Sequence, residues 1–264
     1  MSSLQPPLFV SHGAPDLVLK DIPAARFLRG LFKNRLAPEG IVIVSAHWQT
    51  SDLTITTAPN LETIYDFGGF QRELYQMVYP ARTADWLGKK VAAKFVASGV
   101  EFREDPRRGL DHGAWAPLHL MFPDASIPVV QLSLPRRITP TALFELGEQL
   151  APLSEENILI IGSGASVHNL WRLQPEGAPA PEWAIAFDAW IDRVLSDRDW
   201  HALCRFEDTA HSALAHPTPE HFLPLIFAAG VGQLRSDTVV ARHLHHSFSY
   251  GSIGMSSWEF VHET

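Results

Sequence analysis

Cysteine is almost absent from the sequence. Cys204 is the only cysteine among 264 residues, which excludes an internal disulfide and any group of thiolates that binds a metal. A metal site in this chain therefore has to be built from imidazole and carboxylate groups. The sequence supplies both, with 13 histidines and 29 acidic residues.

Surplus positive charge and long apolar segments are also lacking. The formal net charge is -8, and the 21 Lys and Arg residues are scattered. Phosphate backbones attract clustered basic residues, so the composition argues against a nucleic-acid partner. No apolar run approaches the roughly 20 residues that cross a bilayer, and the start of the chain lacks the basic and apolar segments of a signal peptide. We expect a soluble cytoplasmic protein with no nucleic-acid or membrane partner.

Internal repeats and linkers rich in Gly, Ser or Pro are missing as well, which favours one catalytic domain over residues 1–264. Apolar runs typical of buried strands cover residues 7–10, 40–44, 127–134 and 157–164. Helical patterns cover residues 24–36, 83–98, 139–151 and 182–196. This alternation predicts a single-domain α/β fold with a largely parallel or mixed central sheet, helices on both faces, and a ligand site at the C-terminal ends of the strands.

The stretch from residue 50 to residue 79 has little helical period and is rich in aromatic residues. Irregular segments longer than about 15 residues in a compact domain usually serve a function. We therefore assign this stretch to the wall of a substrate pocket. An extra hairpin packed on the edge of the sheet explains it about as well.

Histidines follow two of the predicted strands directly. His12 comes after the strand at 7–10, and His47 comes after the strand at 40–44. Carboxyl ends of parallel strands gather at one edge of a sheet, so the two imidazoles would be neighbours and share a metal if the strands were adjacent. A hydrogen-bonded structural histidine is the alternative at each position.

His168 stands a few residues after Gly162-Ser163-Gly164, where glycines let the backbone turn sharply and bring a side chain into a cleft. A histidine at a helix start is the alternative interpretation. The Gly-Ser-Gly segment also resembles a phosphate-binding turn, but no lysine follows, so we discount nucleotide binding.

The segment at residues 216–221 contains two prolines and precedes an apolar helical segment at residues 222–229. Prolines fix the backbone, so this segment is suited to aiming one side chain. His221 or Glu220 could complete a three-ligand face that leaves positions open for substrate and for water or dioxygen. A simple helix cap is the alternative.

Asp111 and His112 stand side by side at the start of the segment 111–118, close to Trp115. A carboxylate next to an imidazole can fix its tautomer and raise its basicity, which suits acid–base work behind a metal. The histidines without comparable context are interpreted as surface or structural residues: His119, His201, His211, His243, His245, His246 and His262.

The order of these motifs resembles the class III extradiol ring-cleavage dioxygenases, and most closely their DOPA 4,5-dioxygenase branch. The motifs that carry the resemblance lie at residues 10–13, 45–48, 65–67, 111–118, 162–169, 216–221 and 251–256. They run nearly from end to end of the chain. The resemblance implies an oxidoreductase that opens a catechol-type aromatic, DOPA or a related compound, beside its hydroxyl pair and incorporates both atoms of O2.

The resemblance also implies roles for individual residues. His12, His47 and His221 hold one divalent metal. His168 is the catalytic acid–base residue and a candidate for an additional metal contact, and His112 contacts substrate or dioxygen. The substrate pocket is assigned to Tyr65, Asp66, Trp115 and Asn169.

The sequence departs from the family pattern at two places. Ring-cleavage enzymes usually present two histidines and a carboxylate to iron, whereas the third ligand here is His221, with Glu220 beside it. Three imidazoles also suit zinc, so we expect Fe(II) for activity, Zn(II) as an alternative occupant of purified protein, and a zinc-dependent hydrolase as the alternative function. Gln71 replaces a common proline, which affects the pocket wall.

The expected partners are a small aromatic substrate and O2, with the chain acting as a monomer or homodimer. A non-catalytic binding module of the same fold is a third interpretation. The presence of His168 and His112 beside every metal candidate argues against it.

Overall fold

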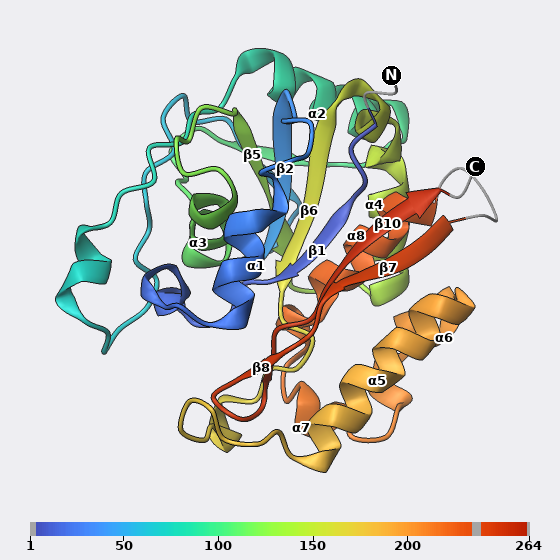
Figure 1. Ribbon diagram of the computed structural model, residues 1–264. Helices are drawn as coiled ribbons and strands as arrows, with labels where there is room; N and C mark the ends of the chain where they lie inside the picture. The colour runs from blue at the N-terminus through green and yellow to red at the C-terminus, as the bar shows by residue number, and fades with distance from the viewer. Residues whose placement is uncertain (1–3, 234–238, 263–264) are drawn as a thin grey trace.

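The structure is a computed structural model that describes residues 4–233 and 239–262. An eight-stranded sheet forms its centre, in the order β4-β3-β5-β2-β6-β1-β10-β7 (Figure 1). The strands are β1 (Leu8–Ser11), β2 (Gly40–Thr50), β3 (Thr54–Thr56), β4 (Arg103–Asp105), β5 (Val129–Pro135), β6 (Ile158–Gly164), β7 (Val239–His245) and β10 (Ser257–His262). A separate two-stranded ribbon pairs β8 (Phe248–Ser249) with β9 (Ile253–Gly254).

Helices surround this sheet. The α-helices are α1 (Pro23–Leu31), α2 (Asp85–Ala97), α3 (His112–Met121), α4 (Pro140–Leu150), α5 (Glu182–Asp197), α6 (Trp200–Cys204), α7 (Ser212–Ala215) and α8 (Leu223–Gln233). Short 3-10 helices are η1 (Pro15–Leu19), η2 (Arg72–Gln76), η3 (Ala151–Glu156), η4 (Leu170–Arg172), η5 (Phe206–Asp208) and η6 (Pro219–His221). No helix in the described ranges is long and apolar enough to cross a membrane.

The four central strands, β5, β2, β6 and β1, are parallel. Antiparallel pairs join β10 to β1, β7 to β10 and β3 to β5, so the sheet is mixed as predicted. Residues 41–44 of β2 are Ile-Val-Ile-Val, each at most 1% exposed. Such continuous apolar strands form because a central parallel sheet is buried on both faces.

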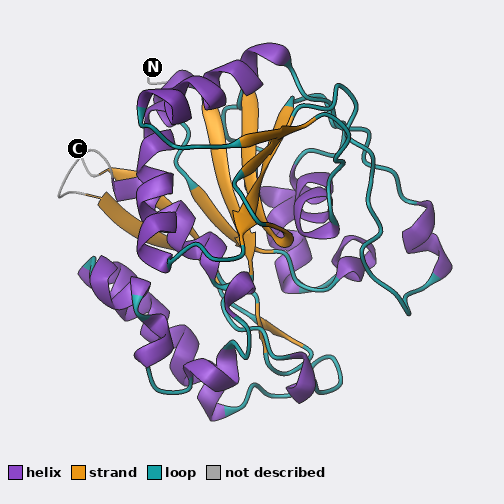
Figure 2. Ribbon diagram, turned by 180° about the vertical axis from the view of Figure 1, so that it is seen from behind, coloured by secondary structure: helices purple, strands orange, loops and turns teal. Residues whose placement is uncertain are grey.

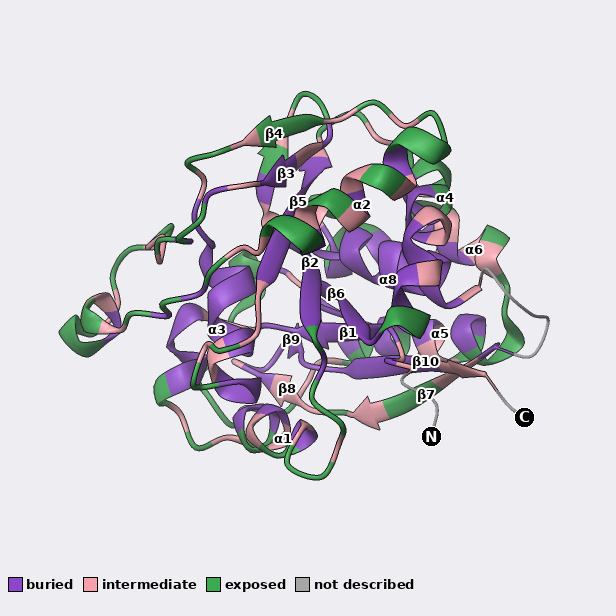
Figure 3. Ribbon diagram, turned by 90° about the horizontal axis from the view of Figure 1, so that it is seen from above, coloured by how far each residue is buried: buried purple, intermediate pink, exposed green. Residues whose placement is uncertain are grey.

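Side chains of β2 alternate between two cores. Val42 and Val44 pack into the core that includes α2, α4, α5 and α8, while Ile41 and Ile43 pack into the core that includes α1 and α3. Figure 2, the view from behind, shows α4 and α8 in front of the strands and α5 below them, and Figure 3 shows the buried strands at the centre with exposed residues on the outer helices. The predicted α/β fold with helices on both faces is therefore confirmed.

Several predicted boundaries were wrong. Helix α1 ends at Leu31 rather than at residue 36. Strand β2 continues past residue 44 to Thr50, so His47 lies within the strand, where the register against β5 shifts between Val44 and Gln49. This irregularity turns residues 45–48 out of the regular pairing.

Helix α3 was not predicted as a helix. Nine of its ten residues are buried, all except His119, so it has no polar face to give a helical period. Pro117 lies inside it and removes the backbone donor that would bond to the carbonyl of Gly113.

The stretch 50–79 has features of both interpretations of the sequence, a pocket wall and an added element of the sheet. Strand β3 joins the sheet through Ile55 opposite Leu132 of β5, but it also pairs in parallel with β4 and does not form a hairpin with β2. The rest is irregular apart from η2. Aromatic residues Tyr65, Phe67 and Tyr75 contact one another there.

Candidate functional site

Three histidines converge at the carboxyl ends of the central strands. The Nε2 atoms of His47 and His12 lie 3.1 Å apart, and those of His221 and His47 lie 3.2 Å apart. Each residue offers one ligand atom, and all three atoms lie within 4.8 Å of one another. Nitrogens about 2.0–2.1 Å from a tetrahedral ion lie about 3.3 Å from one another, so this spacing fits a bound divalent metal.

His12 and His47 were predicted to lie together on the condition that their strands are adjacent. The strands are not adjacent, because β6 runs between β1 and β2. Small residues make the approach possible. A Cβ added at Gly113 would lie 2.8 Å from His47 Cδ2 and 3.1 Å from His12 Cε1. A Cβ at Gly164, at the end of β6, would overlap the carbonyl oxygen of His221. Both glycines are therefore needed for the imidazoles to meet over β6.

Hydrogen bonds fix the tautomer of His12. The Ser163 hydroxyl donates to the carbonyl of Gly113, which Pro117 leaves without its helical partner. With its proton committed, the Ser163 oxygen accepts from Nδ1–H of His12 at 3.0 Å. The unprotonated Nε2 of His12 then faces the other two histidines.

Carboxylates orient the other two imidazoles. Nδ1 of His221 lies 3.0 Å from Glu220 Oε1, which directs the unprotonated Nε2 into the cluster. Nδ1 of His47 lies 3.6 Å from Asp66 Oδ2. Glu220 thus supports His221 from behind and is not the third converging group.

Burial keeps these imidazoles neutral. Desolvation, followed by repulsion from neighbouring histidines, lowers the pKa of His12 and His221 well below the usual value. Burial, then the nearby His112, lowers the pKa of His47 to about 4. A metal can bind neutral imidazoles without displacing protons from them.

His168 lies beside the three histidines. Its ring stacks on His221, with centroids 3.5 Å apart and planes 8° apart. A ligand atom of His168 lies within 4.8 Å of atoms from Glu220 and His221, but His168 does not share such a group with His12 and His47. Burial lowers the pKa of His168 to about 4, so the ring is a neutral base near neutral pH.

His112 begins α3 and does not pair with Asp111, so the pairing expected from the sequence was wrong. Its Nδ1 lies 3.0 Å from Asp66 Oδ1, and its backbone N–H donates to the same oxygen at 2.9 Å. Desolvation raises the pKa of Asp66, but hydrogen bonds from His112 outweigh it and hold that pKa below its ordinary value.

Asp111 faces the interior instead. It caps α3 by accepting from the backbone N–H of Ala114, and it accepts from Ser45 Oγ at 2.6 Å and Gln131 Nε2 at 2.5 Å. It is fully buried. Asp111 therefore anchors the helix that carries His112 rather than tuning the imidazole.

All five of these histidines line one cavity of about 680 Å³. Asp66 lines it, as predicted, together with Glu220 and Thr218. The apolar and aromatic lining residues include Phe67, Phe70, Leu170, Trp171, Leu173, Tyr250 and Ile253. This cavity combines converging imidazoles with apolar walls suited to an aromatic ring.

Tyr65, Trp115 and Asn169 do not line the cavity, contrary to the sequence assignment. The Tyr65 hydroxyl donates to the carbonyl of Met77 at 2.6 Å, and Trp115 Nε1 donates to the carbonyl of Ile64 at 3.0 Å. The Asn169 side chain accepts from the backbone N–H of Trp171. These residues hold the segments that form the wall.

The sequence assignment missed Phe67, Phe70, Trp171 and Tyr250. The first two lie in the aromatic stretch already assigned to the pocket, and Tyr250 precedes the C-terminal motif, so those signals were available. Trp171 stands two residues after Asn169, at the end of another motif, so a similar signal was available for it.

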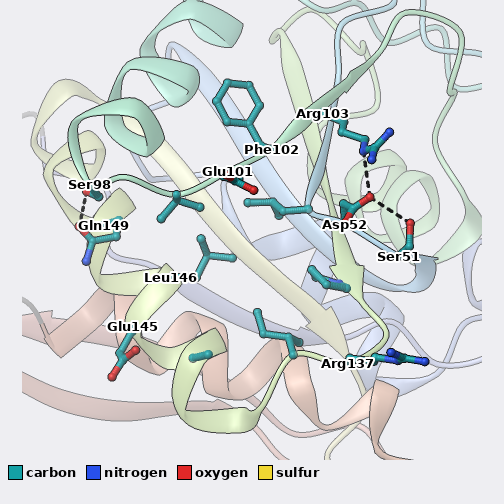
Figure 4. Close-up of a pocket in the computed structure, with 15 residues that line it drawn as sticks. Ser51, Asp52, Ser98, Glu101, Phe102, Arg103, Arg137, Glu145, Leu146 and Gln149 are labelled. Carbon is teal, nitrogen blue, oxygen red and sulfur yellow. Dashed lines mark hydrogen bonds and ion pairs between the residues drawn. The ribbon is translucent and has the colours of Figure 1, made fainter.

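A second cavity is larger, at about 940 Å³, but it has different chemistry (Figure 4). It lies between the turn after β2, the segment after α2, and α4. Asp52 there pairs with Arg103 at 2.9 Å and accepts from Ser51 at 3.2 Å. Its lining contains no histidine. Ligand chemistry, not volume, therefore identifies the functional site.

Comparison with known proteins agrees with this geometry. The family described as the catalytic LigB subunit of aromatic ring-opening dioxygenase matches residues 22–261. The chain belongs to this family. Members of the LigB family are metal-dependent enzymes that open aromatic rings with O2.

Similar proteins match over nearly the whole chain. A 4,5-DOPA dioxygenase extradiol of Beta vulgaris is 37% identical over 260 residues, covering 96% of this chain and 95% of that protein. The protein of the same name from Escherichia coli (strain K12) is 36% identical, covering 87% and 86%. A crystal structure of the uncharacterized Escherichia coli K12 protein JW3007 has a TM-score of 0.81 at 32% identity, covering 97% of this chain and 99% of the other.

Membership of the LigB family accounts for the convergence of imidazoles inside an apolar cavity. A ring-opening dioxygenase needs a place for a metal, a neutral base beside it, and walls that hold an aromatic ring. The cavity described above has groups of each kind.

Proposed function

We propose that the protein is an iron(II)-dependent extradiol dioxygenase that cleaves a catechol-type aromatic ring beside its two hydroxyl groups. The observation that carries the proposal is the convergence of three Nε2 atoms, 3.1 Å and 3.2 Å apart, in an apolar cavity also lined by His168 and His112. Relatives named 4,5-DOPA dioxygenase extradiol indicate a catechol, so DOPA and related compounds are candidate substrates.

His12, His47 and His221 would hold one divalent metal, because their Nε2 atoms are unprotonated and point together. When bound, iron(II) brings the catechol and dioxygen together and lets electrons pass between them. Ser163 and Glu220 keep the imidazoles of His12 and His221 oriented for this role.

His168 is the proposed acid–base residue. Burial lowers its pKa to about 4, so a ring nitrogen is free to accept a proton from a catechol hydroxyl as the substrate binds. The protonated ring can later return that proton to an oxygen of the opened ring. A contact between His168 and the metal stays an additional hypothesis. The ring of His168 stacks on His221, and its ligand atom is not grouped with those of His12 and His47.

His112 is proposed to contact substrate or dioxygen. Asp66 accepts from its Nδ1–H, which leaves Nε2 unprotonated and able to accept a hydrogen bond within the cavity. A single catalytic domain over residues 1–264, acting as a monomer or homodimer, completes the proposal.

Zinc is the alternative metal. The three converging ligand atoms are all imidazole nitrogens, a set that also suits Zn(II), and a zinc-bound water near an open position supports hydrolysis. A zinc-dependent hydrolase is therefore the second candidate function.

Oxygen uptake tests the proposal. Metal-free protein is reconstituted with Fe(II) under anaerobic conditions and offered a panel of catechols, while absorbance follows the yellow ring-opened product. We expect uptake and colour with iron-loaded protein and neither with zinc-loaded protein. Absence of uptake with iron demonstrably bound would contradict the proposal and favour the hydrolase.

A further inference from the structure

The cavity wall offers no free positive charge in the part of the chain that the structure describes. Apart from histidines, its polar lining residues are Asp66, Thr218, Glu220 and Tyr250, with no Lys or Arg among the described lining residues. Asp66 and Glu220 both face histidines. A substrate carboxylate placed against these walls would meet other carboxylates rather than a cation, which is unfavourable unless it stays in water.

Lys20 contacts Tyr250, a residue of the cavity wall, but its charge is already paired. Its ammonium group donates to the Tyr250 hydroxyl and lies 3.1 Å from Asp16 Oδ2 and 3.7 Å from Glu176 Oε2. Two carboxylates thus compensate one positive charge. Lys20 is therefore not a free cation for an anionic substrate, and Arg172, exposed on the segment 170–173, does not line the cavity.

Apolar side chains dominate another part of the same wall. Leu170, Trp171 and Leu173 line the cavity and are nevertheless 60%, 80% and 43% exposed. Their segment is held in place, because Trp171 N–H donates to Asn169 and the next residue, Gln174, donates to the carbonyl of Tyr250. A fixed, exposed apolar surface beside a cavity is typical of a site that binds an apolar group.

The cavity is also larger than one aromatic ring requires. Its volume of about 680 Å³ lies in the range of roughly 300–1,000 Å³ that holds ligands of several rings or chains. Phe67, Phe70 and Ile253 extend the apolar lining beyond the histidines.

We infer that the cavity selects catechols whose ring carries a bulky, uncharged apolar substituent, and that this substituent lies against the segment 170–173. Catechols with a carboxylated side chain, DOPA included, are disfavoured. This inference rests on the proposed function, which supplies the catechol itself. It restricts the expected substrates to a narrower class of catechols than the names of the relatives indicate.

Binding to zinc-loaded protein tests the selectivity without turnover. Propylcatechol and dihydrocaffeate form a matched pair, since a terminal methyl in one replaces a carboxylate in the other. Calorimetry should give a Kd about tenfold or more lower for propylcatechol, and a Kd for phenylcatechol about tenfold lower than for methylcatechol. Equal or tighter binding of dihydrocaffeate would overturn the inference.

Two substitutions locate the selectivity. Trp171→Ala should reduce the preference for phenylcatechol over methylcatechol about fivefold or more, because the ring loses its apolar contact. Trp86→Ala is the matched control: Trp86 is 39% exposed on α2 and does not line the cavity, so the preference should not change. Leu173→Arg should move the preference toward dihydrocaffeate about tenfold, whereas Leu173→Gln should not.

The outcomes separate the inference from the proposed function. If iron-loaded protein turns over no catechol while the Kd values follow the expected order, the proposed function fails and the binding preference stands. If Trp171→Ala leaves the preference unchanged and instead converts a dimer into a monomer in sedimentation, the segment is a subunit interface and the inference fails.

Discussion

The densest run of histidines in the chain lies on and just after β7, yet the imidazoles that converge come from segments far apart in sequence. The β7 histidines, His243, His245 and His246, lie within four residues of one another. Nevertheless the rings of His243 and His246 are 5.8 Å apart, and each faces a different carboxylate. The histidines proposed to hold the metal, by contrast, are His12, His47 and His221, and their Nε2 atoms face one another.

Charge environment separates His243 and His246 from the converging histidines. Asp192 lies 3.0 Å from His243, and Asp188 lies 3.3 Å from His246 and raises its pKa through a hydrogen bond. Desolvation lowers the pKa values of His12, His47 and His221 instead. Burial also lowers the pKa of His245 to about 4, but its Nε2 faces the Ser247 hydroxyl at 2.8 Å rather than another histidine. Proximity in sequence therefore says little about ligand chemistry. What matters is whether burial leaves the nitrogens neutral and aimed at a common point.

The largest expected effect is loss of metal on removing a converging nitrogen. His47→Ala should weaken metal binding by more than about 100-fold, because it removes the nitrogen that lies closest to both other ligands. His243→Ala is the matched control and should leave metal content unchanged. Elemental analysis of both variants tests this contrast, and full metal content in His47→Ala would remove the distinction between the two groups.

Removing the proposed base should stop turnover while the metal stays. His168→Ala should lower kcat by about 10²–10⁴-fold, because the variant lacks the neutral imidazole that accepts the catechol proton. His246→Ala, in the β7 group, should have no effect on kcat. Metal content is measured alongside the rate, and substantial loss of metal in His168→Ala would make His168 a ligand instead of a base.

Substitution of the carboxylates that face the two groups of histidines should also have different effects on kcat. Asp66→Asn replaces the carboxylate that accepts from Nδ1–H of His112 by a neutral amide, and the loss of charge should lower kcat by about 10–100-fold with the fold intact. Asp192→Asn makes the equivalent change beside His243 and should leave kcat unchanged. Steady-state kinetics with circular dichroism compares them, and similar losses in both variants would mean that Asp66 has only a general structural role.

The smallest effects concern stability against pH, and their signs are opposite. Burial lowers the pKa of His216 to about 4. In metal-free protein between about pH 6.5 and pH 4, His216 is therefore protonated in the unfolded state and neutral in the folded state. The unfolding free energy should therefore fall as pH drops from about 6.5 toward 4, by on the order of 2–3 kcal/mol for a histidine of this kind.

His246 should act in the other direction. Its pKa is raised, so its contribution is present below about pH 6.5 and is lost as pH rises through the folded-state value. The side chain is 54% exposed, which limits the effect to a few tenths of a kcal/mol. Urea unfolding of the wild type and His246→Gln across this pH range measures both signs. Greater stability at pH 4 than at pH 7 in the wild type would contradict the assignment for the buried group.

The sequence predicted those parts of the fold that local patterns determine. The central strands are long apolar runs, and α4 and α5 have a helical period, so their positions were close to the observed ones. Helix α3 was missed because it is buried on nearly all sides, and β3 and β4 have only three residues each. Strand β7 carries exposed Arg242 and His243, which hide its apolar alternation.

In the candidate site too, the sequence predicted what local patterns determine. His12, His47 and His168 were identified because they follow predicted strands, and the structure brings them close to His221. Pairing of His112 with Asp66 could not be predicted, because the two residues are separated by 46 positions and meet only through the path of the long aromatic loop. The sequence neighbour Asp111 was the misleading choice.

The origin of the oxygen atoms in the product tests the central claim most directly. Iron-loaded protein is given a catechol under oxygen-18 gas in ordinary water, and the ring-opened product is examined by mass spectrometry. The account predicts that both atoms of one labelled dioxygen molecule are found in the product and that His47→Ala forms none. A product that contains only unlabelled oxygen, or a product formed without dioxygen, would contradict it.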